Sequence, residues 1–179
     1  IRHPDLKENF YLAIDRVFSM KGFGTIVTGT LRGGEIALGE EVEILPLMKK
    51  ARIRGIETHK KKIVKAVPHS RVALNVAGVA ADEIKRGDVI VKPGSAEPSW
   101  RFDAQLRLLS NAKRALKHNE QVRLFYATSE VLARTRILGQ DSIQPGETAY
   151  AQIELFSPLV ALKNDRFIIR RLSPPETIG

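Results

Sequence analysis

Closely spaced glycines and threonines near the start of the chain are the first residues whose types suggest chemistry. The stretch GFGTIVTGT, from Gly22 to Thr30, has the composition of a phosphate-binding loop. A dinucleotide fingerprint needs a third glycine and a following helix, however, and a P-loop needs Gly-Lys-Ser/Thr at the start of a helix. Here the β-branched run from Thr25 to Thr28 follows Gly24 and favours a strand. We therefore interpret Gly22 and Gly24 as the turn of a β-hairpin.

Two basic clusters have the residue types that contact phosphate and ribose. The first cluster contains eight cations opposed only by Glu57: Lys49, Lys50, Arg52, Arg54, Lys60, Lys61, Lys62 and Lys65. The second cluster consists of Lys113, Arg114, Lys117, His118 and Arg123. It precedes the aromatic pair Phe125 and Tyr126 and the hydroxyl residues Thr128 and Ser129. Cations beside hydroxyls suit RNA contacts, whereas lysines alone are usually a solvated face. On this evidence nucleic-acid binding and a solvated face both stay open.

Residue patterns for catalysis or metal binding are scarce. The chain has no cysteine, and its four histidines have neither an i,i+4 partner nor a nearby carboxylate pair, so we expect no metal site. No Gly-x-Ser-x-Gly motif occurs. The tripeptide Arg86-Gly87-Asp88 lies between alternating segments, where Gly-Asp is typical of a turn. We expect no catalytic residue in this chain.

Alternating apolar and polar residues predict an all-β protein of two domains. In the first half the predicted strands lie within 10–15, 25–30, 42–45, 51–56 and 71–77, and Gly-containing turns between them are typical of a small barrel. The segment from Val91 to Ser99 contains two prolines, a glycine and two serines, which indicates a domain boundary. Alternation then resumes within 102–109, 121–126, 131–138, 149–155 and 166–170. We predict two tandem β-barrels, over residues 1–97 and 98–179.

Composition and charge narrow the class of protein. The 179 residues are 43% hydrophobic and carry a net charge of +9, with an excess of five positive charges before Pro98 and four after it. Such a balance favours a polyanionic partner, although solubility alone explains a few surplus lysines. No apolar run approaches the roughly 20 residues of a membrane helix, and no signal peptide is evident. We expect a soluble, cytoplasmic protein that does not bind membranes.

Longer segments of the sequence resemble a known family. Residues 13–30, AIDRVFSMKGFGTIVTGT, and their continuation from Gly34 to Leu45 resemble the second domain of translational GTPases of the elongation factor Tu type. Within that superfamily, the segments 50–56, 71–78 and 173–179 are similar to SelB, the family of selenocysteine-specific elongation factors. The resemblance covers almost the whole chain. It implies a domain-2-like barrel over 1–97 and a domain-3-like barrel over 98–179.

The resemblance also implies that this chain is part of a longer protein whose domains have different functions. In this family GTP and Mg are held by an amino-terminal GTPase domain with a P-loop, and winged-helix domains at the other end bind a messenger RNA hairpin. We therefore expect this chain to be the middle pair of domains, with no cofactor of its own and no GTP hydrolysis alone. The implied partners are selenocysteinyl-tRNA, the ribosome, and the GTPase and winged-helix domains of the same protein.

Candidate site residues follow from the family motifs. Asp15, Arg16 and Arg71 match positions of the aminoacyl pocket, where general elongation factors have two acids and an amide side chain. Because a selenol is acidic enough to be an anion at neutral pH, two arginines would favour selenocysteine over serine. The residues implied to contact the acceptor and T arm of the tRNA are Lys117, His118, Arg123, Tyr126, Thr128 and Arg171.

Two other functions remain compatible with the sequence. The same double barrel occurs in other tRNA-binding or initiation-type translational GTPases. A β-barrel that binds proteins, with charge that only confers solubility, is the third alternative. Preference for selenocysteinyl-tRNA over seryl-tRNA separates the first two, and salt-sensitive tRNA binding separates both from the third.

Overall fold

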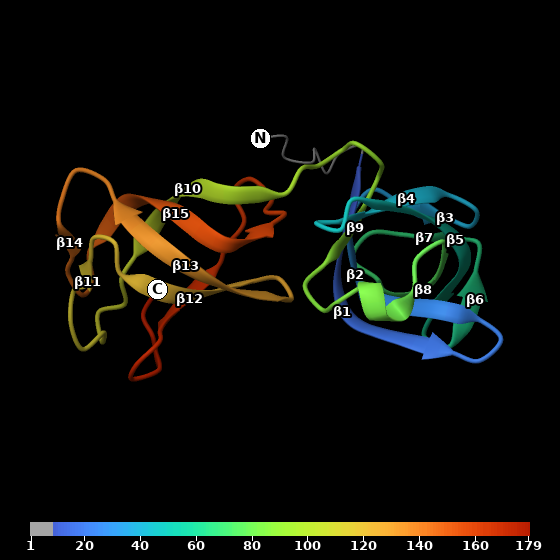
Figure 1. The fold of residues 1–179 in the computed structure, drawn as a ribbon, viewed down its shortest axis with the longest axis horizontal. Helices are drawn as coiled ribbons and strands as arrows, with labels where there is room; N and C mark the ends of the chain where they lie inside the picture. Colours follow the sequence, from blue (N-terminus) through green and yellow to red (C-terminus); the bar gives the residue numbers. More distant parts are fainter. Residues whose placement is uncertain (1–8) are drawn as a thin grey trace. The chain divides into compact units, whose positions relative to one another are not determined.

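The chain folds into two compact units of β-strands. The computed structural model describes residues 9–179. The first unit ends at Pro98 and also includes Val160–Lys163, and the second comprises Ser99–Leu159 and Asn164–Gly179. Figure 1 labels the strands of the two units and colours them from the amino terminus to the carboxyl terminus. The short return of residues 160–163 to the first unit has no counterpart in the sequence pattern.

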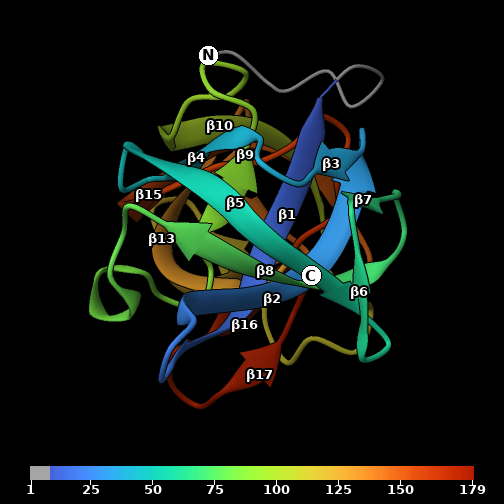
Figure 2. The ribbon, with the colours of Figure 1, turned by 90° about the vertical axis from the view of Figure 1, so that its right-hand side faces the viewer.

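The first unit is a closed barrel. Its sheet has the order β4-β9-β1-β2-β8-β5-β6, and a further pairing of β4 with β5 closes a ring of six strands, which Figure 2 shows from the side of this unit. The elements of this unit are β1 (Phe10–Met20), β2 (Gly24–Gly33), β3 (Ile36–Ala37), β4 (Glu41–Leu45), β5 (Lys49–Thr58), β6 (Lys61–Ile63), β7 (Lys65–Ala66), β8 (Arg71–Ala77), the 3-10 turn η1 (Ala81–Glu83) and β9 (Val89–Val91).

The second unit is a six-stranded sheet that curls on itself. Its order is β10-β15-β13-β12-β16-β17, and the amide of Leu109, just after β10, donates to the carbonyl of Ile178, just after β17, at 2.7 Å. This bond joins the two ends of the sheet. The strands are β10 (Ser99–Arg107), β11 (Leu116–Lys117), β12 (Gln121–Tyr126), β13 (Ser129–Ile137), β14 (Ser142–Ile143), β15 (Thr148–Leu159), β16 (Ile168–Arg171) and β17 (Glu176–Thr177). The prediction of two tandem β-barrels is confirmed.

Alternation along the strands explains why each barrel has one apolar face. In β8, Val72, Leu74 and Val76 are buried while the residues between them are more exposed. The inward-facing rows of the first barrel form one continuous hydrophobic core. Tyr11 belongs to the buried set, and its hydroxyl donates to the carbonyl of Val160 at 3.0 Å, which helps to hold residues 160–163 in this unit.

The glycine-rich stretch that opened the sequence analysis is a hairpin turn. Met20 pairs with Gly24 across β1 and β2, and the amide of Phe23 donates to the carbonyl of Met20 at 2.9 Å. Gly22 and Gly24 have φ angles of 84° and 85°, in the region that glycine adopts at no steric cost. The prediction that this stretch forms a β-hairpin is confirmed. In the described residues no helix is long and apolar enough to cross a membrane.

A β-bulge interrupts the hairpin where β1 passes Gly29. Ile14 pairs with Gly29 and Arg16 with Thr28, so Asp15 is one extra residue in β1. Ile14 before the bulge is fully buried, and Val17 after it packs against the same core. The extra residue therefore keeps the apolar row inside and places Asp15 and Arg16 together on the outer face.

The second barrel contains a buried arginine that joins three parts of the chain. The Arg171 guanidinium pairs with Glu120 and with Glu176, and it also donates to the carbonyl of Arg114 at 2.6 Å. Burial by itself raises the pKa of Glu120, but hydrogen bonds from Arg114 and from the backbone of Lys117, together with the charge of Arg171, lower it overall. The loop before β12 is thereby fastened to the last strands.

Substitution of Gly29 tests the close approach at the bulge. A Cβ atom there would lie 2.4 Å from the carbonyl oxygen of Ala13 and 2.6 Å from Leu12 Cδ2. Because the first of these atoms is backbone, we expect Gly29→Ala to lower the free energy of unfolding by about 3 kcal/mol, measured by urea denaturation. Gly55→Ala is the control, since its Cβ would meet only Asn75 Cβ at 3.4 Å. Equal stability of the two variants would contradict the argument.

The buried ion pairs of the second barrel should depend on pH. Since the folded-state pKa of Glu120 is lowered, its contribution is present above the unfolded pKa and is lost as pH falls through the folded value. We expect Glu120→Gln to cost about 3 kcal/mol near neutral pH, and the difference from wild type to shrink in acid. Glu130→Gln removes an exposed partner of Arg123 and should cost less than about 1 kcal/mol. A constant difference across the pH range would contradict this assignment.

Candidate functional site

On the outer face of the first barrel, the side chains of Arg71 and Thr28 both contact the carboxylate of Asp15. The Arg71 guanidinium donates to Asp15 through both terminal nitrogens, with an Nη2 to Oδ1 distance of 3.0 Å and an Nη1 to Oδ2 distance of 2.9 Å. The hydroxyl of Thr28 donates to Oδ1 at 2.6 Å. Both carboxylate oxygens are therefore occupied. The Asp15 side chain is 20% exposed and that of Arg71 is 57% exposed, so the group borders solvent.

Arg16 completes this group from the neighbouring position on β1. It lies directly opposite Thr28 in the strand pairing, and its side chain is exposed. Within residues 9–179 its guanidinium has no hydrogen-bond or ion-pair partner. The structure thus places Asp15, Arg16 and Arg71 around Thr28, and it adds Thr28 as a member that the sequence analysis did not name.

Strand pairing and one turn position these residues. Arg71 begins β8 and pairs with Thr30 of β2, two residues from Thr28 on the same face. The turn at Asp88 fixes β1 at the bulge, because the amide of Ile14 donates to the carbonyl of Asp88 at 2.9 Å. Asp88 closes its own turn by accepting from the amide of Lys85 at 2.9 Å. Burial raises the pKa of Asp88, although the bond from Lys85 partly offsets this effect.

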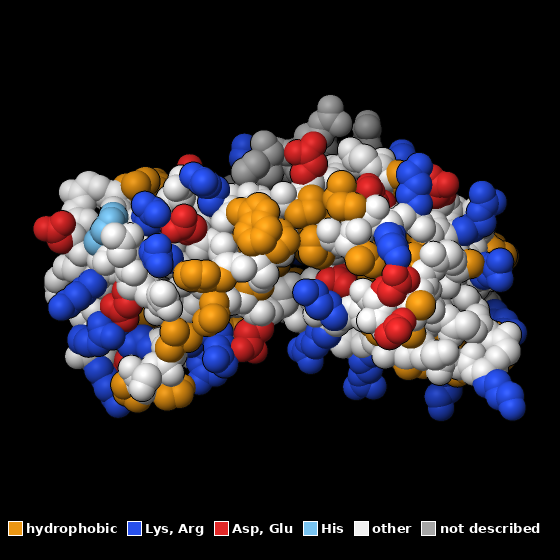
Figure 3. Space-filling model, viewed as in Figure 1, with side chains coloured by type: hydrophobic (Ala, Val, Ile, Leu, Met, Phe, Trp, Pro, Cys, Tyr) orange, Lys and Arg blue, Asp and Glu red, His pale blue; other side chains and the backbone are white. Residues whose placement is uncertain are grey.

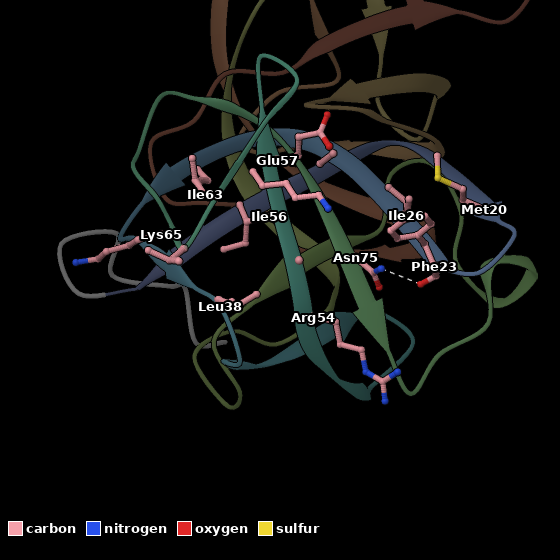
Figure 4. Close-up of a pocket in the computed structure, with 14 residues that line it drawn as sticks. Met20, Phe23, Ile26, Leu38, Arg54, Ile56, Glu57, Ile63, Lys65 and Asn75 are labelled. Carbon is pink, nitrogen blue, oxygen red and sulfur yellow. Dashed lines mark hydrogen bonds between the residues drawn. The ribbon is translucent and has the colours of Figure 1, made fainter.

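A hollow of about 740 Å³ lies on the same face of the barrel. Figure 4 shows Met20, Phe23 and Ile26 on one side of it and Leu38 and Ile63 on the other. Its walls come from the hairpin of β1 and β2, from β5, from β6 and from β8. The members of the lining that carry polar or charged groups are Arg54, Glu57, Lys62, Lys65 and Asn75.

The hollow directly adjoins the Asp15 group. Ala73 lines it and is the cross-strand partner of Thr28, whose hydroxyl contacts Asp15. Directly opposite residues in an antiparallel pair have Cβ atoms about 5 Å apart. The ionic group and the hollow therefore form one continuous site, charged at one end and largely apolar at the other.

Two contacts shape the apolar end. The Asn75 amide donates to the carbonyl of Phe23 at 2.8 Å, which fixes the hairpin turn against β8 (Figure 4). The Lys62 ammonium lies 6.0 Å from the centre of the Phe23 ring, within the range of a cation–π contact. An aromatic ring, apolar walls and a few charged groups at the edge are suited to a nucleoside-sized ligand.

In the second barrel, three of the predicted RNA-contacting residues are exposed. Lys117 ends β11 and His118 follows it, with His118 Nδ1 lying 3.0 Å from the carbonyl oxygen of Ile137. Arg123 lies on the outer face of β12, opposite Arg170 of β16, and forms an ion pair with Glu130 at 3.0 Å. Thr128 is half-buried between β12 and β13.

Two of the predicted RNA-contacting residues are instead enclosed by protein. Arg171 is only 3% exposed and is held by Glu120, Glu176 and backbone carbonyls. Tyr126 is 4% exposed, and its hydroxyl donates to Asp165 at 2.8 Å. Direct contact of these side chains with RNA, as the family motif implied, does not agree with their burial. Neither side chain is exposed enough to form part of an RNA-binding surface.

Arginine side chains lie against aromatic rings at two places on the second barrel. The Arg170 guanidinium lies 5.9 Å from the Phe125 ring centre, and that of Arg134 lies 5.7 Å from the Phe156 ring centre. Figure 3 shows basic side chains interspersed with acids and with exposed hydrophobic side chains on one face of this unit. Cations beside aromatic rings are the residue types that can contact phosphates and stack on bases.

Sequence reasoning missed Thr28 and the hollow for a common reason. The β-branched run from Thr25 to Thr28 indicates a strand, but only strand pairing shows that Thr28 lies opposite Arg16 on one side and Ala73 on the other. In residues 9–179 no group of three His, Cys, Asp or Glu side chains is placed to hold a metal ion, and His3 lies outside that range.

Comparisons with known proteins agree with this architecture. Residues 24–91 match the family model "Elongation factor Tu domain 2", and residues 103–179 match "Selenocysteine-specific elongation factor, beta-barrel domain". A selenocysteine-specific elongation factor of Desulfomicrobium baculatum is 38% identical over 177 residues, which make up 98% of this chain and 28% of that protein. The chain thus spans little more than a quarter of that relative's length. It belongs to the family of selenocysteine-specific elongation factors, of which it carries a domain-2 barrel followed by the family's β-barrel domain.

Proposed function

We propose that this chain binds the aminoacyl end of selenocysteinyl-tRNA, as part of a longer elongation factor that delivers this tRNA to the ribosome. The observation that carries the proposal is the group of Asp15, Arg16 and Arg71 beside the hollow of the first barrel. The kinship with selenocysteine-specific elongation factors supports the choice of amino acid.

Charge selects selenocysteine over serine in this proposal. A selenol is an anion at neutral pH, whereas a serine hydroxyl is neutral and a cysteine thiol, with a pKa of about 8.5, is mostly neutral. Arg16 and Arg71 together exceed the single charge of Asp15, so the group carries a net positive charge. An anionic side chain therefore gains more from this site than a neutral side chain of similar size.

The hollow provides room for the nucleoside to which the amino acid is esterified. Phe23 supplies an aromatic surface, and Met20, Ile26 and Ile63 supply apolar walls. The Glu57 carboxylate at its edge can accept from ribose or base donors. Because the hollow adjoins the Asp15 group, a seated nucleoside would direct its amino acid toward the arginines.

The body of the tRNA would lie on the second barrel in this proposal. Lys117, His118 and Arg123 offer exposed donors to phosphates, and Thr128 lies near them in sequence. Contacts of this kind position the RNA without reading its sequence. They would act on different tRNAs alike, so discrimination falls to the first barrel.

The chain catalyses no reaction in this proposal. GTP and its magnesium ion would be held by an amino-terminal GTPase domain, and winged-helix domains would bind messenger RNA. These domains of the complete factor are the further proposed partners. The two barrels then serve as the part of the factor that recognises the charged tRNA.

Neutral substitution of either arginine tests the pocket. In the complete factor we expect Arg16→Met or Arg71→Met to weaken binding of selenocysteinyl-tRNA by roughly ten- to a hundredfold, since a charge-assisted contact contributes about 1.5 to 3 kcal/mol. The loss for seryl-tRNA should be smaller. The excess loss should fade as pH falls far enough to protonate the selenol. Dissociation constants measured with both tRNAs check these expectations.

A matched control and a contrary outcome define this test. Arg52→Met removes an exposed arginine from β5, outside the Asp15 group, and should leave both affinities unchanged. Equal losses for both tRNAs in the Arg16 and Arg71 variants would mean that these arginines contact RNA in place of the side chain.

Charge reversal on the second barrel tests the proposed RNA surface. We expect Lys117→Glu combined with Arg123→Glu to weaken binding of different tRNAs alike and to flatten the dependence of affinity on salt, because fewer counterions are released. Filter binding over a range of salt concentrations measures both effects. Lys92→Glu with Lys163→Glu changes the net charge equally at exposed positions of the first unit and should have a smaller effect. Unchanged affinity of the first variant would place the RNA surface elsewhere.

A further inference from the structure

The contact between Asp15 and Arg71 raises a question about the proposed pocket. Arg71 donates to Asp15 through two nitrogens, at 3.0 and 2.9 Å, so its charge is already balanced in this structure. Paired donors on a carboxylate form one of the stronger side-chain contacts. An incoming anion therefore gains Arg71 only if Asp15 finds another cation.

An aminoacyl ester brings that cation with it. Its α-amino group, with a pKa of about 7.7 to 8 in peptides, is largely an ammonium at neutral pH. Selenocysteine adds an anion at the side chain, so the ligand carries one charge of each sign. The site carries one carboxylate and two guanidiniums, and it can match both charges only by a change of partners.

We propose that Asp15 is an exchangeable counter-ion, which holds Arg71 when the pocket is empty and releases it to the selenolate when the α-ammonium of the ligand takes its place. This inference rests on the proposed function, because it specifies how the same pocket recognises its ligand. Within residues 9–179 Arg16 has no partner to release, so in this scheme it attracts the anion from the outset. Free amine and anionic side chain are then recognised together and not independently.

Thr28 keeps the carboxylate in place during this exchange. Its hydroxyl donates to Oδ1 at 2.6 Å, and this bond does not involve Arg71. The bulge also fixes the backbone of Asp15, through the pairing of Ile14 with Gly29 and of Arg16 with Thr28. Asp15 can therefore change its cationic partner without leaving its position. Thr28 is a positioning residue in this scheme.

Acetylation of the α-amino group tests the exchange in the wild-type factor. The acetylated ligand cannot occupy Asp15 as a cation, so Arg71 stays bound to the carboxylate. We expect acetylation to weaken the binding of selenocysteinyl-tRNA by about tenfold more than the binding of seryl-tRNA. The preference of the factor for selenocysteinyl-tRNA should therefore fall. Dissociation constants of the four tRNAs, charged with either amino acid and acetylated or not, give this difference directly.

Variants separate the exchange from simple loss of the amine contact. In Asp15→Asn the arginine is free at all times, so the preference for selenocysteine should no longer depend on acetylation. Thr28→Val should weaken that dependence without a change of charge, and Thr28→Ser should restore it. Glu41→Gln is the control, because it removes one negative charge from the same barrel at a residue whose partner is Lys50. In this variant the effect of acetylation on the preference for selenocysteine should match that of wild type. Thermal unfolding of each variant verifies its fold.

Each outcome bears on a defined part of the scheme. If wild type prefers selenocysteinyl-tRNA but acetylation weakens the binding of both tRNAs equally, the exchange is overturned and the proposed pocket is retained. If wild type shows no preference at all, the proposed pocket and the exchange are overturned together. A preference that falls on acetylation in wild type, and not in Asp15→Asn, supports the exchange.

Discussion

The single extra residue of β1 at Asp15 is the constraint on which the candidate site depends. A strand with regular alternation cannot place two successive side chains on the same face. The bulge removes that restriction, so Asp15 and Arg16 both lie outside while Ile14 and Val17 both face the core. At the bulge β1 comes so close to residue 29 of β2 that only glycine fits there, because a Cβ atom would collide with the carbonyl oxygen of Ala13. Core packing and the charged site are thus consequences of one local irregularity.

The two barrels are stabilised by different kinds of contact. The first barrel closes through the pairing of β4 with β5 and surrounds an apolar core. The second barrel fastens the loop before β12 with the buried Arg171 and its partners Glu120 and Glu176. A buried charge is costly unless it is paired and hydrogen-bonded, and here several acceptors surround the guanidinium. An arginine that a sequence motif assigns to RNA is thus used to position neighbouring residues.

In the proposed function, recognition would divide between a compact site on the first barrel, charged at one end and largely apolar at the other, and a broader basic surface on the second barrel. In the first of these, a few charges lie next to apolar walls, so small changes of ligand charge would have large effects there. On the surface of the second barrel, arginines such as Arg123 and Arg134 are paired with acids at 3.0 and 3.7 Å and remain partly exposed. Such contacts are screened by salt and respond to the number of phosphates more than to their identity. This arrangement agrees with the proposed module, which would bind the general shape of a tRNA and discriminate between the amino acids attached to it.

Local pattern alone determined most of the architecture. Period-two alternation is a property of neighbouring residues, so strands such as β8 and β12 and the Gly22–Gly24 turn were predictable from sequence. Motif similarity identified Asp15, Arg16 and Arg71 as candidates, although the last two lie 55 positions apart in the sequence. Tertiary structure decided the rest, because it depends on which strands pair and in which register. Pairing placed Thr28 between Arg16 and Ala73, and closure of the second barrel buried Tyr126 and Arg171. A residue's neighbours along the chain do not specify its neighbours across a sheet, and burial depends on the latter.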